Sequence, residues 1–142
     1  MLTFINDLKT PKRMKDFKKY YTILAPTEEI YLALTIPLGI KLWSGAEAEM
    51  STEPGSEFSL FEGDVVGKNL EFVEGKKIVQ QWYFEGQNEP SIVTIKIHEG
   101  KSKTSSSVKL QHTNIPDDVY DEFVDGWNTS YFGELYEFFD GE

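Results

Sequence analysis

The sequence predicts an α+β fold made of one N-terminal strand, two short helices, an antiparallel β-meander and one long C-terminal helix. Three observations predict it. Short runs rich in apolar residues recur at fairly even spacing through the middle of the chain, separated by turns that contain glycine. Two prolines begin segments of helical character ahead of these runs. After the last run, the apolar residues change to a helical period.

The N-terminal part of this pattern is a strand followed by two helices. Residues 17–24 are rich in β-branched and aromatic side chains, which favour strands. Pro26 ends this strand and precedes a helix over residues 27–34, because proline suits the first turn of a helix. Pro37 forces a new start, so residues 38–43 are predicted to form a second short helix.

The meander is predicted from strand-like runs between glycine turns. In residues 91–98 valine and isoleucine alternate with polar residues. Val108, Leu110 and His112 likewise share one face of a later strand. An antiparallel sheet with one buried face produces this alternation. The predicted strands cover residues 46–50, 57–61, 67–73, 78–84, 91–98 and 105–113.

The last segment is predicted to be a long helix that begins at Pro116. Acidic residues largely occupy the side opposite an apolar stripe, which is typical of a helix that covers a core. Gly126 and Gly133 weaken a helix, so we expect them to allow close approach to a strand or to leave room for a ligand. The stripe consists of Tyr120, Phe123, Val124, Trp127, Tyr131, Leu135 and Phe138.

The composition argues against several classes of site and partner. The chain has 142 residues and no cysteine, which rules out disulfides, thiol nucleophiles and thiolate-bound metals. Its formal net charge is −10, which repels nucleic-acid phosphates and anionic membrane surfaces. Arg13 is the only arginine, so a phosphate-rich partner is not expected. No apolar run reaches the roughly 20 residues that span a membrane.

The domain organisation is expected to be simple. We predict one domain over residues 14–142, preceded by an N-terminal arm at residues 1–13, with Met14 as an alternative start. No internal repeat or low-complexity tract divides the chain. The lack of cysteines and of a secretory signal predicts a cytoplasmic protein. We expect no cofactor and no metal, and either a monomer or a homodimer.

Several short motifs, in this order and spacing, resemble one known superfamily. They are Ile23 to Pro26 with Ile30 to Thr35, Trp43, Gly55 to Phe61 with Gly63 and Gly67, Ile78 to Trp82, Leu110 to His112, and Gly126-Trp127. Over roughly residues 16–140 the chain resembles the START-like (SRPBCC) superfamily, and most closely the family of the C-terminal domain of the activator of heat-shock-protein-90 ATPase. It departs from that family where Lys103 to Ser106 replace a Gly-Thr pair, and in the position of the aromatic pair Tyr131-Phe132.

The resemblance implies a helix-grip fold, in which a curved antiparallel sheet wraps around the C-terminal helix and leaves a cavity between them. Members of the superfamily bind hydrophobic small molecules in that cavity, and some catalyse cyclisations or hydrolyses. Chaperone activation belongs to eukaryotic proteins in which this domain is joined to a separate N-terminal domain. A chain of this length cannot hold both domains, so the full two-domain mechanism is not expected.

The tryptophans are the first candidates for the wall of such a cavity, because an indole offers a flat apolar surface and one N–H donor. Trp43 is interpreted as core, whereas core and pocket roles both remain open for Trp82 and Trp127. Gln80 shares a face with Trp82, and the strand register decides whether that face is buried. The ligand-binding candidates are Gln80, Trp82, Phe84, Leu110, His112, Phe123, Trp127 and Tyr131.

The two histidines, His98 and His112, are the natural acid–base groups near neutral pH. His112 shares a face with apolar neighbours, so it could bind a ligand carbonyl or act as a general base. His98 is predicted on the face of its strand opposite the apolar residues. The simpler interpretation of both is a structural histidine with satisfied hydrogen bonds. Two histidines without matching carboxylates do not predict a metal site.

Three functions are therefore weighed. The first is a module that binds a hydrophobic small molecule between the sheet and the C-terminal helix, without covalent chemistry. The second is a protein-interaction domain that acts on a chaperone ATPase, or on another client, through its acidic surface. The third is a cyclase or hydrolase in which His112 works with a tyrosine. The sequence has no phosphate loop and no nucleophile elbow.

Overall fold

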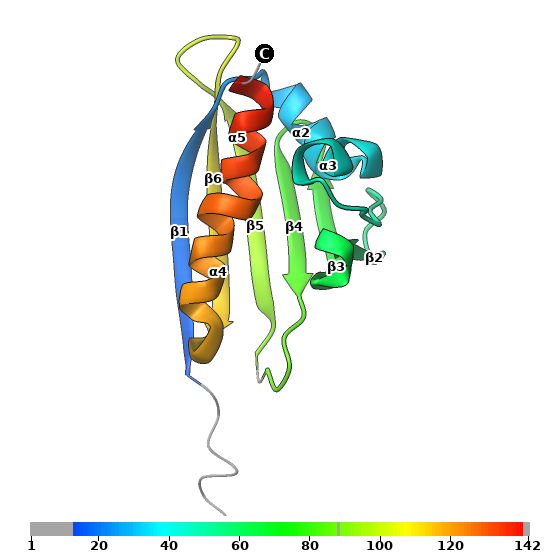
Figure 1. The fold of residues 1–142 in the computed structure, drawn as a ribbon, viewed down its shortest axis with the longest axis vertical. Coiled ribbons are helices and arrows are strands. Elements are labelled where there is room, and N and C mark those ends of the chain that lie inside the picture. The colour runs from blue at the N-terminus through cyan, green and yellow to red at the C-terminus, as the bar shows by residue number, and fades with distance from the viewer. Residues whose placement is uncertain (1–12, 88, 141–142) are drawn as a thin grey trace, which may run out of the picture.

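The computed structural model describes residues 13–87 and 89–140, which form a six-stranded antiparallel sheet packed against helices (Figure 1). The strand order is β1-β6-β5-β4-β3-β2, so the first and last strands are neighbours at one side of the sheet. The predicted N-terminal arm, residues 1–13, lies outside the described residues except for Arg13. The strands are β1 (Met14–Ile23), β2 (Glu57–Leu60), β3 (Val65–Val73), β4 (Lys77–Trp82), β5 (Ser91–Glu99) and β6 (Ser106–Pro116).

One predicted strand is wrong. Residues 46–50 make only an isolated antiparallel bridge, in which Glu49 and Ser59 exchange two backbone hydrogen bonds of 2.9 Å. The segment lies beside β2, which has 4 residues and ends where the chain turns at η1 (Phe61–Gly63). So short a strand offers little backbone for a ladder. The other predicted strands are present, with ends that differ by a few residues.

The two short helices are confirmed as α2 (Thr27–Thr35) and α3 (Pro37–Ser44). α3 has its proline in the first turn and ends at Gly45, whose φ of 76° is a left-handed conformation that glycine adopts easily. Trp43 is buried, and its Nε1 donates a 2.7 Å hydrogen bond to the carbonyl oxygen of Ala33. This bond joins the two helices and confirms the core role of Trp43.

The long C-terminal helix is also confirmed, but its predicted start is wrong, because Pro116 ends β6 and the α-helical part begins at Tyr120. The helix also has one irregularity. A π-helical turn inserts an extra residue, which brings Tyr131 and Phe132 both to the buried side. A prediction based on a regular 3.6-residue period misses Phe132, whose ring stacks on Tyr21 of β1 at 4.2 Å. The segments are the 3₁₀ turn η2 (Asp117–Val119), α4 (Tyr120–Gly126), the π turn η3 (Trp127–Tyr131) and α5 (Phe132–Asp140).

The π turn is held in place by side chains and by a glycine. Asn128 Oδ1 accepts hydrogen bonds from Lys19 Nζ at 2.9 Å and from Tyr21 Oη at 2.7 Å. A Cβ atom on Gly133 would lie 2.7 Å from the carbonyl oxygen of Asn128. Gly133 therefore serves close approach within the helix itself, rather than approach to a strand.

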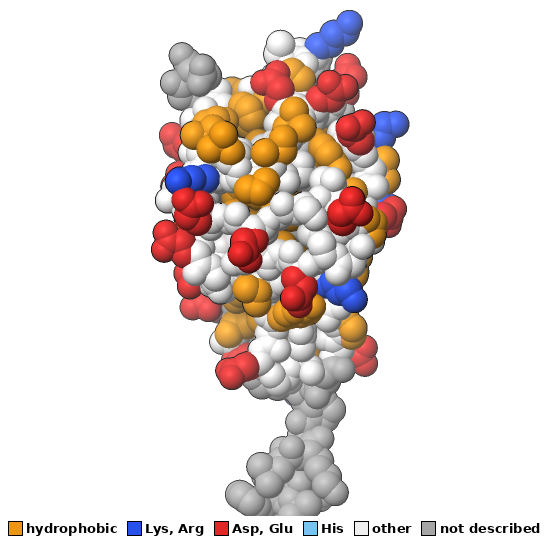
Figure 2. Space-filling model, turned by 90° about the vertical axis from the view of Figure 1, so that its right-hand side faces the viewer, with side chains coloured by type: hydrophobic (Ala, Val, Ile, Leu, Met, Phe, Trp, Pro, Cys, Tyr) orange, Lys and Arg blue, Asp and Glu red, His pale blue; other side chains and the backbone are white. Residues whose placement is uncertain are grey.

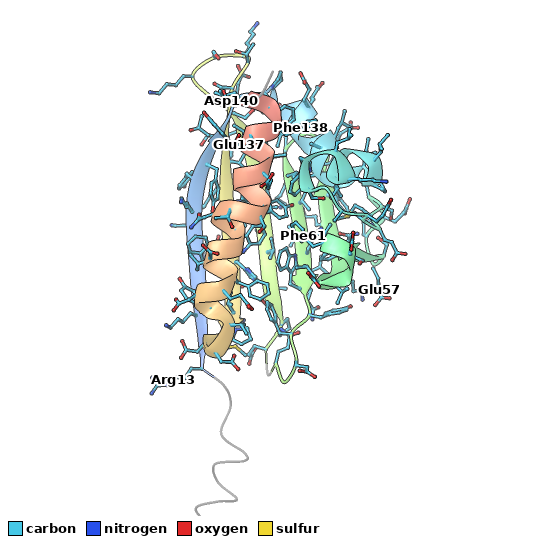
Figure 3. All side chains as sticks on the ribbon, viewed as in Figure 1. Arg13, Glu57, Phe61, Glu137, Phe138 and Asp140 are labelled. Carbon is cyan, nitrogen blue, oxygen red and sulfur yellow. The ribbon has the colours of Figure 1, made fainter. Side chains whose placement is uncertain are left out.

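The core lies between the helices and one face of the sheet, where side chains occupy the space between the ribbons (Figure 3). This is the helix-grip arrangement that the resemblance implied. In the parts of the chain that the structure describes, no helix is long and apolar enough to cross a membrane. The alternation predicted for β5 and β6 is confirmed by the buried side chains of Val93, Ile95, Ile97, Val108, Leu110 and His112.

Candidate functional site

Aromatic rings occupy the space between the sheet and the C-terminal helix, where a cavity was expected. Trp82 and Trp127 stack with their ring centroids 4.7 Å apart. Phe123 meets the Trp82 ring edge-on at 6.1 Å, and Phe84, just beyond β4, lies 4.8 Å from Phe123. Leu110 is completely buried. The structure therefore brings these candidate residues together in a packed cluster.

His112 lies inside this cluster with both ring nitrogens engaged. Trp127 Nε1 lies 3.0 Å from His112 Nδ1, and an indole nitrogen can only donate, so Nδ1 is the acceptor. His112 Nε2 therefore carries the proton and donates to Ser91 Oγ at 2.8 Å. Ser91 Oγ in turn donates to the carbonyl oxygen of Thr113 at 3.0 Å. These hydrogen bonds leave no free imidazole nitrogen for a ligand.

Burial of the neutral ring lowers the pKa of His112 to about 3. Protonation would place an N–H on Nδ1, directly opposite the indole N–H of Trp127. The geometry thus matches the structural interpretation of His112. His98 is exposed on the opposite face of the sheet, as predicted. Among the described residues no group of three or more His, Asp or Glu side chains could hold a metal ion.

Gln80 takes part in a second buried chain of hydrogen bonds. Trp82 Nε1 donates to Gln80 Oε1 at 3.1 Å, and Gln80 Nε2 donates to Asn69 Oδ1 at 3.0 Å across the β3–β4 pair. Asn69 Nδ2 donates at 3.1 Å to the Ser51 carbonyl and to Ser56 Oγ. The face that Gln80 shares with Trp82 is therefore buried, and the amide is satisfied within the protein.

An open cleft of about 440 Å³ lies beside this closed cluster, between the C-terminal helix and η1. Phe61 of η1 lies on the side of that turn that faces the helix (Figure 3). Aromatic rings and two carboxylates dominate the cleft. Its lining is formed by Phe61, Asp64, Val65, Trp82, Glu122, Phe123, Gly126, Trp127, Ser130 and Tyr131.

The cleft divides the predicted candidates into two groups. Trp82, Phe123, Trp127 and Tyr131 line it. Sequence reasoning missed Phe61 of η1, the following Asp64 and Val65, and the polar residues Glu122 and Ser130 of the C-terminal helix, because most of these are not buried aromatics. The candidates outside the lining are Gln80, Phe84, Leu110 and His112.

Gly126 leaves room in this cleft, as one interpretation of the sequence expected. Outside the adjoining turns of its own helix, no atom lies within 4 Å of the position that a Cβ would occupy there. Gly126 has φ −60° and ψ −42°, ordinary α-helical values that any residue adopts. A larger side chain at this position would therefore enter the cleft without backbone strain.

The Tyr131 hydroxyl is the one polar group in the aromatic wall whose partner is missing. The side chain is only 5% exposed, and no described residue forms a hydrogen bond with it. Every fully buried side-chain nitrogen or oxygen in the described part of the chain has a hydrogen-bond partner. Because the Tyr131 oxygen has none, it is not fully buried. The cleft is the opening that Tyr131 lines. Burial raises the pKa of Tyr131 above its ordinary value, so the hydroxyl stays neutral.

The turn that forms the opposite wall has an unusual backbone. Phe61, Glu62 and Gly63 follow one another with φ values of 53°, 56° and 93°. Residues other than glycine seldom adopt this region, and each costs about 1–3 kcal/mol. The turn presents the Phe61 ring to Tyr131, with centroids 6.4 Å apart, and to Trp43 at 6.3 Å.

A different surface, the α2–α3 face, exposes large apolar side chains. We define it as Leu32, Ile36, Leu38 and Leu42, which are 50%, 45%, 65% and 61% exposed. Figure 2 looks onto this side of the molecule and shows hydrophobic side chains gathered in its upper half, with acidic side chains around them. Contiguous exposed apolar surface with a polar rim is typical of protein interaction sites.

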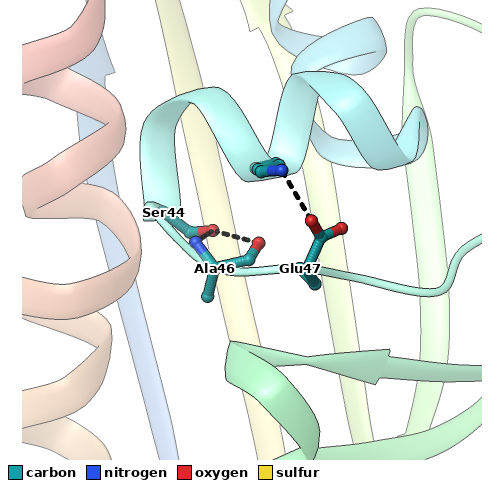
Figure 4. Close-up of polar contacts among 4 residues, drawn as sticks. Ser44, Ala46 and Glu47 are labelled. Atoms are coloured by element: carbon teal, nitrogen blue, oxygen red, sulfur yellow. Dashed lines mark hydrogen bonds and ion pairs between the residues drawn. The ribbon is translucent and has the colours of Figure 1, made fainter.

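The charge beside this face is balanced by an ion pair. Lys41 Nζ lies 2.6 Å from Glu47 Oε1 in the segment that follows α3 (Figure 4). Ser44 Oγ accepts a hydrogen bond from the Ala46 amide at 3.2 Å and shapes the same turn.

Sequence reasoning did not predict the exposed face. Its signal is that both short helices carry apolar residues on every side, more than one core can bury.

Comparison with known proteins gives concordant matches. The family model described as activator of Hsp90 ATPase homolog 1-like protein matches residues 24–140. The structure of an HSP90 activator from Plasmodium falciparum has a TM-score of 0.78 and 28% identity, covering 91% of this chain and 97% of that chain. The Aha1 dimer from Colwellia psychrerythraea has a TM-score of 0.72 at 20% identity, covering 89% and 96%, which shows the fold alone.

The curated relatives are longer than this chain. A protein of Schizosaccharomyces pombe is 43% identical over 67 residues, which are 47% of this chain and 20% of that protein. The mouse activator of 90 kDa heat shock protein ATPase homolog 2 is 21% identical over 108 residues, 76% of this chain and 33% of that protein. The chain thus spans between a fifth and a third of these two relatives.

Proposed function

The chain belongs to the family of activator of Hsp90 ATPase homolog 1-like proteins, and we propose that it binds a chaperone ATPase of the 90 kDa heat-shock class through its α2–α3 face. The observation that carries this proposal is the exposure of four large aliphatic side chains on two adjoining helices and the residue that joins them. By contrast, the interior that was expected to hold a ligand is filled with paired polar groups and stacked rings.

The charge of the protein supports a basic partner surface. The formal net charge is −10, and acidic side chains, with some lysines among them, lie around the apolar patch in Figure 2. Complementary charge speeds association and fixes orientation, while apolar contacts supply most of the affinity. We therefore expect binding to weaken as salt rises, because exposed charges are screened over about 8 Å at physiological ionic strength.

The test is to titrate purified chaperone with this protein by calorimetry and to follow the rate of ATP hydrolysis. The double variant Leu38→Ser/Leu42→Ser should lose roughly tenfold or more in affinity, because central apolar contacts dominate protein interfaces. The matched control Tyr20→Ser/Val73→Ser removes exposed apolar side chains elsewhere and should bind like the unmodified protein. Equal binding by the two double variants would contradict the assignment of the face.

Small-molecule binding is a second candidate function, favoured by the unpartnered Tyr131 hydroxyl in the cleft. Ligand pockets usually measure about 300–1,000 Å³, and the cleft falls within this range. Native mass spectrometry of freshly purified protein should show a mass excess that denaturation removes. The variant Gly126→Leu places a side chain into the cleft without strain, so it should lose that excess while remaining folded.

A further inference from the structure

The charged residues that line the cleft are all of one sign. Asp64 and Glu122 are its two ionisable carboxylates, and both are exposed at its rim. No lysine, arginine or histidine belongs to the described lining. None of the described ion pairs neutralises either carboxylate. The mouth of the cleft is therefore a region of negative potential above an apolar floor.

The floor and walls suit a flat ligand. Trp82 and Trp127 stack on each other and form a nearly buried floor, while the partly exposed rings of Phe61 and Phe123 line the sides. The faces of aromatic rings attract cations as well as apolar surfaces. The neutral Tyr131 oxygen can accept a hydrogen bond from an ammonium group. The negative rim, the aromatic floor and the free hydroxyl all favour a ligand that carries both an aromatic ring and an ammonium group.

We infer that the cleft between η1 and the C-terminal helix binds an aromatic amine, with its ring against Phe61 and Phe123 and its ammonium group between Asp64 and Glu122. This inference rests on the second candidate function, that the cleft takes a small molecule. It specifies that the molecule is positively charged, a preference that a purely hydrophobic cavity would not have. It does not depend on chaperone binding at the α2–α3 face.

Three probes of one shape separate charge from apolar contact: phenethylamine, phenethyl alcohol and 3-phenylpropionate. Each is titrated into the ¹⁵N-labelled protein, and the indole N–H signals of Trp82 and Trp127 report occupancy. The backbone amide signal of Glu99, at the end of β5 and outside the cleft lining, is the internal reference. The amine should bind roughly fivefold more tightly than the alcohol, the size of one surface charge pair, and the acid most weakly.

Substitutions then test which groups create the preference. Asp64→Asn/Glu122→Gln should remove the difference between amine and alcohol, while Glu57→Gln/Glu134→Gln, an equal change of charge on exposed residues outside the cleft, should preserve it. Tyr131→Phe should weaken the amine and leave the fold intact, because its hydroxyl makes no bond within the described protein.

The outcomes separate the preference for an amine from small-molecule binding in the cleft. Amine-selective binding that disappears in the Asp64/Glu122 variant supports both. If the alcohol and the acid bind as tightly as the amine, the charge preference is wrong and small-molecule binding stands. If no probe shifts the two indole signals at millimolar concentration, both are wrong.

Discussion

The interior cluster and the α2–α3 face are both built from large apolar side chains, but the cluster is buried and the face is exposed. In the cluster, Trp82 and Trp127 stack, and each indole N–H has an acceptor. On the face, Leu38 and Leu42 are more than half exposed and contact no comparable layer. The difference shows that aromatic content alone does not locate a binding site. What matters is whether the surrounding atoms already satisfy and cover the side chains.

The largest expected effect comes from opening the closed region. Trp127→Ala should destabilise the protein by about 3–5 kcal/mol, because it leaves a cavity and removes the donor to His112 Nδ1. Leu38→Ala on the face should change the free energy of unfolding by no more than about 0.5 kcal/mol. Urea denaturation followed by circular dichroism measures both. A similar loss in the free energy of unfolding for the two variants would contradict the difference between the buried cluster and the exposed face.

The pH dependence of stability tests whether His112 of the interior cluster is buried in its neutral form. The pKa of His112 is lowered from 6.5 to about 3 by burial, so the folded state binds fewer protons than the unfolded state between these values. Stability is therefore full above about pH 6.5 and falls as the pH decreases toward 3. Between about pH 7.5 and pH 5.5 we expect a loss of about 1.4 kcal/mol from this group.

His112→Gln is the matched variant for this measurement. It should be less stable at neutral pH, because the bonds from Trp127 and to Ser91 cannot both be kept in the same geometry. Its stability should nevertheless change about 1.4 kcal/mol less over the same pH interval. An unmodified protein whose denaturation midpoint does not move in that interval would contradict a buried neutral His112.

The smallest predicted effect compares two glycines of the C-terminal helix. Gly126→Ala should raise the free energy of unfolding by about 0.5–1 kcal/mol, because its Cβ would meet no atom and alanine favours a helix. Gly133→Ala should lower it, because its Cβ would lie 2.7 Å from the Asn128 carbonyl oxygen. Thermal unfolding of the pair checks the signs, and a gain at both positions would argue against the π turn.

Much of the fold could be predicted because local rules govern it. Pro26 and Pro37 set the helix starts, and alternation identified the buried faces of β5 and β6. Residues 46–50 were mistaken for a strand because Ala48 and Met50 do pack against the core, and only the missing ladder distinguishes them. A ladder depends on a partner strand, which no local pattern records.

The site was predicted less well, for a related reason. Trp82, Phe123, Trp127 and Tyr131 line one cleft, because the strand and helix periods place them on facing surfaces. The sequence could not show that the hydrogen bonds of Gln80 and His112 close within the protein. It also could not show that Tyr131 stays unpaired. Both facts depend on tertiary distances rather than on residue type or spacing.

The most direct test of the account is a methyl NMR titration of the protein with the chaperone, which observes both regions in one experiment. We predict that methyl signals of the α2–α3 face (Leu32, Ile36, Leu38 and Leu42) broaden or shift, while those of the buried residues Ile95, Leu110 and Leu135 stay in place. Changes confined to the buried methyl groups, with the face unaffected, would contradict the claim that this protein acts through its exposed helices.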